Sequence, residues 1–98
     1  MTIILFCSHW MCIPSLEAIH SYRFLKGMVI PAENNESRER LHGIGKQLNV
    51  PVKRAGKDDL SNGIRTWLES KKPDAVFLFT FPYRIPQELL SIPHRLKQ

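Results

Sequence analysis

Thr2–Cys7 reads TIILFC and Ala75–Thr80 reads AVFLFT, and these two runs decide the fold class. Both are almost continuously apolar, which is typical of strands that helices cover on both faces. Leu25–Ile30, LKGMVI, is a third β-favouring run. Val50–Arg54, VPVKR, alternates and contains Pro51, which has no N–H for a ladder hydrogen bond, so we expect this strand at an edge of the sheet.

Helical patterns separate these runs. Pro14–Tyr22 begins with a proline, which is favoured at the first helical position. Glu36–Leu48 has apolar residues at helical spacing, and Asp58–Lys71 has a similar stripe that ends before Pro73. We also predict a short helix over Pro86–Ser91. The chain therefore alternates strand and helix throughout.

The predicted order is β-α-β-α-β-α-β, within a single domain of 98 residues. Strands joined through helices are parallel, and their crossovers are right-handed. We therefore predict an α/β fold with a Rossmann-like open parallel sheet and strand order 3-2-1-4. Ligands of such sheets bind beyond the carboxyl ends of the strands, where the first and fourth strands diverge. Ser8–Cys12 and Phe81–Ile85 would line that crevice.

The composition excludes several classes of function. No run of about 20 apolar residues is present to span a membrane, and the amino-terminal run lacks the basic start of a secretory signal. Two cysteines are too few for a disulfide framework, so we expect reduced thiols in a cytoplasmic protein. The net charge of +5 is spread along the chain without a basic stripe, so we rank nucleic-acid binding last.

The loop Ser8–Cys12, SHWMC, contains no glycine where a dinucleotide binder has G-x-G-x-x-G, which argues against bound NAD or FAD. Cys7 and His9 with Cys12 do not make the four regularly spaced ligands of a structural zinc site, so we predict no metal. Trp10 has two interpretations, a flat ring that covers a ligand or ordinary packing. Phe81–Pro86, FPYRIP, also has two, a stiff ligand-facing loop or a rigid connection.

Several motifs, in order along the whole chain, resemble the N-terminal part of the formyltransferase family, most closely the methionyl-tRNA formyltransferases. Residues 3–19 read I-I-L-F-C-x(4)-C-I-P-S-L-E-A-I, which is similar to a strand and loop followed by V-P-S-L-E-A-L. Residues 48–52 resemble a G-I-P-V segment, and 72–76 with 85–90 resemble N-P-D-L-I-V and I-L-P-x-E-x-L. Tyr83-Arg84-Ile85 is also similar to the M-R-I-L loop of phosphoribosylglycinamide formyltransferase.

The resemblance implies transfer of a formyl group from 10-formyltetrahydrofolate to an amine. It implies a folate-binding role for Tyr83, Arg84 and Ile85, and places Ser8, His9 and Trp10 on the side of the acceptor substrate. The family's catalytic Asn-x-His and later Asp have no counterpart here, and the glycine of its first loop is also missing.

We therefore interpret residues 1–98 as an incomplete formyltransferase N-terminal subdomain with no catalytic residues, inactive as a lone chain. The alternative is a non-catalytic module for folate or nucleotide binding or for assembly. The apolar strand 75–80 would have an unpaired outer edge, because the family sheet continues beyond it. Such edges pair with other chains, so we predict a homo-oligomer formed through this strand.

Overall fold

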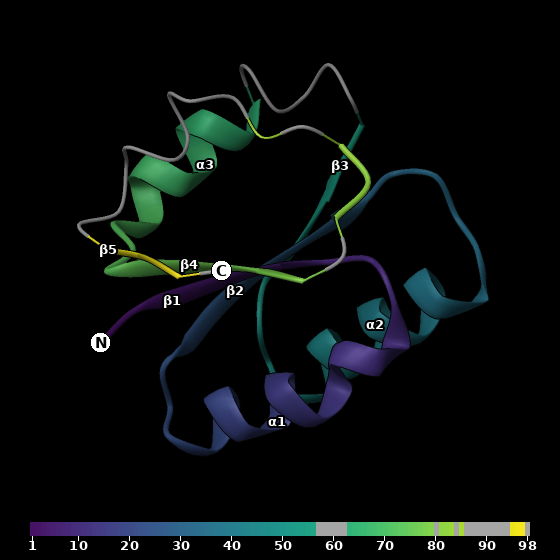
Figure 1. The fold of residues 1–98 in the computed structure, drawn as a ribbon, viewed down its shortest axis with the longest axis horizontal. Helices are drawn as coiled ribbons and strands as arrows, with labels where there is room; N and C mark the ends of the chain where they lie inside the picture. The colour runs from purple at the N-terminus through teal and green to yellow at the C-terminus, as the bar shows by residue number, and fades with distance from the viewer. Residues whose placement is uncertain (57–62, 80, 84, 86–94, 98) are drawn as a thin grey trace.

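The computed structural model describes residues 1–56, 63–79, 81–83, 85 and 95–97. Its strands form one parallel sheet in the order β3-β2-β1-β4-β5 (Figure 1). The α/β class and the order 3-2-1-4 of the first four strands confirm the prediction. In chain order the elements are β1 (Ile3–Cys7), the 3₁₀ turn η1 (Trp10–Cys12), α1 (Ile13–Ser21), β2 (Leu25–Pro31), α2 (Glu36–Gln47), β3 (Val52–Ala55), α3 (Gly63–Lys71), β4 (Ala75–Phe79) and β5 (Arg95–Lys97).

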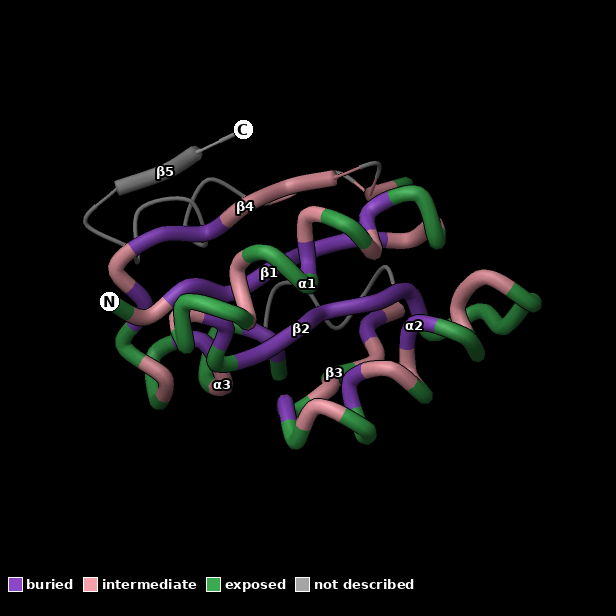
Figure 2. Tube along the Cα trace, turned by 90° about the horizontal axis from the view of Figure 1, so that it is seen from below, coloured by how far each residue is buried: buried purple, intermediate pink, exposed green. Residues whose placement is uncertain are grey.

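Helices cover both faces of the sheet, with α1 and α2 on one side and α3 on the other (Figure 1). The strand period of two divides β1 between the two resulting cores. Ile4 and Phe6 belong to the cluster that α3 covers, whereas Leu5 and Cys7 belong to the cluster beneath α1 and α2. Every residue of β1 is buried (Figure 2), which explains why its sequence is continuously apolar.

Local signals fix the helix ends. Pro14 lies in the first turn of α1, where its missing N–H removes no intrahelical hydrogen bond. Asn35 caps α2, because its side-chain Oδ1 accepts a 2.9 Å hydrogen bond from the Arg38 N–H. A cap of this kind contributes about 1 kcal/mol to stability. The predicted start of α3 at residue 58 and the helix 86–91 lie outside the described residues.

The outer edge of β4 differs from the prediction. β5 pairs with it in parallel, with Ala75 opposite Arg95 and Phe77 opposite Lys97. The free edge expected over strand 75–80 is therefore wrong for residues 75–77, because the chain satisfies those backbone groups with its own later residues. The premise of the predicted homo-oligomer, an unpaired edge along this strand, does not hold over that stretch. β3 occupies the opposite edge, as Pro51 predicted.

None of the helices among the described residues combines the length and the apolar character needed to cross a membrane.

Candidate functional site

A hollow of about 580 Å³ lies at the carboxyl ends of β1 and β4. The last residues of these strands, Cys7 and Phe79, are paired in the sheet, so the loop after β1 starts beside the end of β4. The order β2-β1-β4 makes this the point where the chain reverses its direction across the sheet, which is where open α/β sheets bind ligands. The residues that line the hollow are Ser8, His9, Met11, Cys12 and Phe79.

The imidazole of His9 lines this hollow. Its Nδ1 accepts a 3.2 Å hydrogen bond from the backbone N–H of Met11. A neutral imidazole that accepts through Nδ1 carries its proton on Nε2, so His9 is held in the tautomer that donates through Nε2. With the ring of Phe79 and the side chain of Met11, the hollow combines apolar surface with an imidazole that carries its proton on Nε2.

Trp10 is separated from its two neighbours in the predicted acceptor set. Trp10 is 46% exposed, and its ring lies 5.2 Å from the His9 ring, centroid to centroid. On α2, the Arg40 guanidinium lies 5.7 Å from the Trp10 ring centroid. Ser8 and His9 line the hollow, and Trp10 lies beside it without being one of its lining residues, so both interpretations of Trp10 stay predictions.

The predicted folate-facing residues lie on the other face of the sheet. Phe81 packs edge-on against Phe6 at 5.3 Å between centroids, and Tyr83 packs edge-on against Phe81 at 5.9 Å. Tyr83 and Ile85 thereby pack against the core that α3 covers, whereas the lining residues Cys12 and Phe79 pack against the core beneath α1 and α2. Arg84 lies outside the described residues. The structure thus places Tyr83 and Ile85 on one face of the sheet and Ser8 and His9 beside the hollow on the other, at the same end.

Arg54 organises the loop after β2, a role that no pattern in the sequence indicates. It lies in the edge strand β3, and its guanidinium donates to the Pro31 carbonyl at 3.0 Å and to Asn34 Oδ1 at 3.1 Å. A longer contact of 3.4 Å reaches the Ala32 carbonyl, and Nη1 lies 3.2 Å from His42 Nδ1. The planar fork of an arginine suits such convergent acceptors. Arg54 thereby fixes the loop that follows β2 at the carboxyl end of the sheet.

A second contact ties this loop to the segment after β4. The Tyr83 hydroxyl donates a 3.4 Å hydrogen bond to Glu33 Oε1, and the Arg38 Nη1 donates to the Glu33 carbonyl at 2.6 Å. The loops after β2 and β4 therefore meet above the end of β1, on the side of the sheet that α3 covers.

The two cysteines are neighbours at the edge of the hollow. Both are buried free thiols, with Cys7 at the end of β1 and Cys12 immediately before α1. A hydrogen bond between the thiols lowers the pKa of Cys12, against the opposing effect of burial, and raises that of Cys7. Cys7 therefore acts as the S–H donor and Cys12 as the more acidic thiol. Nowhere in the described part of the chain do three His, Cys, Asp or Glu side chains gather closely enough to hold a metal ion.

No protein-family model and no curated protein matches this chain. The resemblance to formyltransferases therefore rests on the sequence motifs alone.

Proposed function

We propose that this chain is the ligand-binding N-terminal part of a formyltransferase-type protein and binds a folate-type molecule at the carboxyl ends of β1 and β4. The observation that carries the proposal is the hollow beside the paired residues Cys7 and Phe79, at the reversal point of the sheet. The motifs along the chain resemble those of the formyltransferase family, and this resemblance implies 10-formyltetrahydrofolate as the cofactor.

The lining suits a flat heterocycle with polar edges. Phe79 provides an aromatic surface, and aromatic rings favour offset or edge-on contact with other rings. His9 provides a donor whose direction is fixed by the hydrogen bond at its other nitrogen. In the proposed arrangement the pterin lies against Phe79 in the hollow and the acceptor amine approaches Ser8 and His9. The folate-binding role that the resemblance implies for Tyr83 and Ile85 requires the ligand to reach past the end of the sheet to the side that α3 covers.

Formyl transfer itself needs more than these groups. The amine attacks the formyl carbon, so a base must take its proton and a donor must stabilise the oxyanion of the tetrahedral intermediate. The 98 residues contain no Asn-x-His sequence to supply these functions. We therefore propose that this chain binds and orients its ligand, and that turnover requires residues from outside it.

The second candidate is a non-catalytic module for a different flat ligand, such as a nucleotide. Met11, Cys12 and Phe79 make much of the hollow apolar, which suits any planar ring and is not specific for a pterin. A nucleotide would bind here without a glycine-rich phosphate loop, so its ring would contribute most of the affinity.

Titration with 5-formyltetrahydrofolate, a stable folate, tests the proposal. A ligand at a hundredfold excess over its Kd stabilises the fold by about 2.7 kcal/mol, which thermal unfolding and calorimetry detect readily. We expect binding that His9→Ala and Tyr83→Phe weaken. Tyr22→Phe is the matched control, because Tyr22 is 70% exposed and follows α1 at the opposite end of the sheet. No stabilisation at millimolar folate would contradict the proposal, and stabilisation by a nucleotide alone would favour the second candidate.

A further inference from the structure

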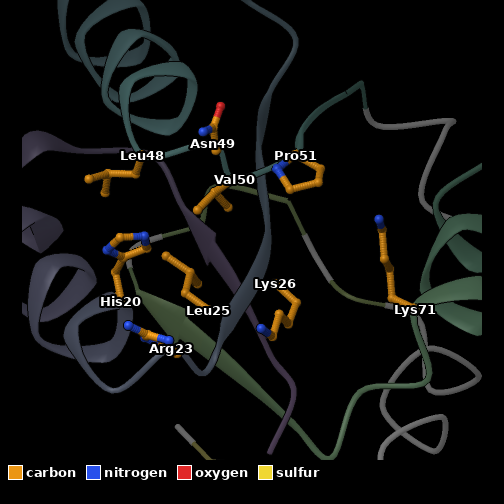
Figure 3. Close-up of a pocket in the computed structure, with 9 residues that line it drawn as sticks. All are labelled: His20, Arg23, Leu25, Lys26, Leu48, Asn49, Val50, Pro51 and Lys71. Carbon is orange, nitrogen blue, oxygen red and sulfur yellow. The ribbon is translucent and has the colours of Figure 1, made fainter.

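A second hollow, of about 530 Å³, lies at the amino-terminal end of the sheet, opposite the site described above (Figure 3). Arg23 and His20 come from the end of α1, Leu25 and Lys26 from the start of β2, and Lys71 from the end of α3. The connection between α2 and β3, Leu48–Pro51, completes the wall. Its size is within the range of sites for small organic ligands.

The hollow carries a surplus of positive charge. Its lining includes Arg23, Lys26 and Lys71, and none of the described residues that line it is an aspartate or a glutamate. None of the three forms an ion pair within the described residues, whose ion pairing is confined to Arg65 and Glu69. Lys71 Nζ instead lies 5.7 Å from the centroid of the Trp67 ring.

The negative partial charges at the helix C-termini offset only part of this positive charge. Three helices end near this side of the sheet, and each C-terminus carries about half a negative charge, which basic residues commonly balance. Three such ends amount to about −1.5 charges, against three full positive charges in the lining. The remaining charge is positive, so an anion is attracted to this hollow.

Arg23 occupies a backbone conformation that favours glycine. Its φ is 63°, in the left-handed region, just after the end of α1. Lys72, after α3, has a φ of 49° and the same kind of position, but it does not line the hollow. Asn49, after α2, has the same conformation, which is a common way for a helix to end, and at Arg23 it places a cation on the wall of the hollow.

The floor of the hollow is apolar. Leu25 and Val50 are buried, with 4% and 6% of their surface exposed, and Leu48 and Pro51 extend the same surface outwards. A cationic rim above an apolar floor selects an anion attached to an apolar body. We propose that this hollow binds a small organic phosphate, with the phosphate between Arg23 and Lys26 and the apolar group against Leu25 and Val50. An arginine fork matches the oxygens of a phosphate, and the surplus charge suits a dianion.

Phenyl phosphate is the probe, with inorganic phosphate and phenol as its two halves. Titration of ¹⁵N-labelled protein at low salt should give saturable shifts of the Lys26 and Asn49 amides, and an affinity at least fivefold higher than for either half. The site is independent of the proposed folate site, so the Ser8 and His9 amides should not move. Absence of saturable shifts at 10 mM (about a hundredfold above a Kd of 0.1 mM), or an equal affinity for inorganic phosphate, would overturn the proposal.

Arg23→Gly is the decisive variant, because glycine relieves the left-handed backbone and so removes the cation without harming the fold. We expect it to weaken phenyl phosphate binding at least fivefold. Lys72→Gly removes a charge at the same kind of backbone position outside the lining, and we expect a change of less than twofold. Equal weakening by both variants would show non-specific attraction and overturn the proposed site.

Discussion

Gly45→Ala should destabilise this fold, although alanine is the better helix former. Gly45 is buried within α2 and faces β3. A Cβ added there would collide with Cγ2 of Val52 on β3, and it would lie 3.4 Å from Met28 Sδ and 3.5 Å from the Val50 carbonyl. The glycine therefore permits the contact between α2 and β3.

Two opposing contributions set the size of the change in unfolding free energy. Alanine in a helix interior is favoured over glycine by about 1 kcal/mol. Overpacking a close-packed site costs about 1–3 kcal/mol, and Val52, half-buried on an edge strand, can shift only in part. We expect a net loss of about 1 kcal/mol, which lowers Tm by about 4–8 °C in a domain of this size.

Gly43→Ala is the matched control, two residues earlier in the same helix. A Cβ at Gly43 meets no atom within 4 Å, so only the helix-propensity term applies. We expect a gain of about 0.5–1 kcal/mol, measured for both variants by urea and thermal unfolding followed by circular dichroism. If Gly45→Ala proves as stable as Gly43→Ala, the close packing of α2 on β3 is refuted.

Three further predictions concern other parts of the molecule. Gly27→Ala should cost about 1–3 kcal/mol and alter the Trp67 fluorescence, because the added Cβ would lie 2.6 Å from Trp67 Cη2; unchanged emission and stability would contradict this packing. Arg54→Ala should accelerate proteolysis of the loop after β2 and destabilise the fold by about 1–3 kcal/mol, and a cleavage pattern like that of the unchanged chain would count against the role assigned to the guanidinium. Iodoacetamide should label Cys12 before Cys7 in mass spectrometry, because hydrogen bonding to Cys7 lowers the pKa of the Cys12 thiol. Cys7→Ala removes that donor, so the pKa of Cys12 should rise and its labelling should move to higher pH; an unchanged pH profile would refute the thiol pair.

Much of the sheet could be predicted from the sequence because burial on both faces leaves a plain signal. Continuous apolar runs predicted β1 and β4, and Pro51 predicted the edge position of β3. The helix pattern over 36–48 gave α2, whose end differs by one residue. These features depend on local chemistry and on rules of chain connection, which a sequence contains directly.

Other features depend on contacts between distant residues. β5, Arg95–Lys97, is short and basic, and its place in the sheet comes from backbone pairing with β4, so no apolar pattern marks it. In the sequence Arg54 looks like any basic residue of an edge strand, because its role depends on contacts with the distant loop after β2. The same holds for the site, because the face towards which Tyr83 turns is decided by the rings of Phe6 and Phe81.

The most direct test of the central claim is a ¹H–¹⁵N NMR titration of the labelled chain with 5-formyltetrahydrofolate. We expect saturable shifts of the Ser8, His9 and Phe79 amides, at the carboxyl ends of β1 and β4, together with that of Tyr83. Saturable shifts confined to the Lys26 and Asn49 amides at the opposite end, or no shifts at millimolar ligand, would contradict it.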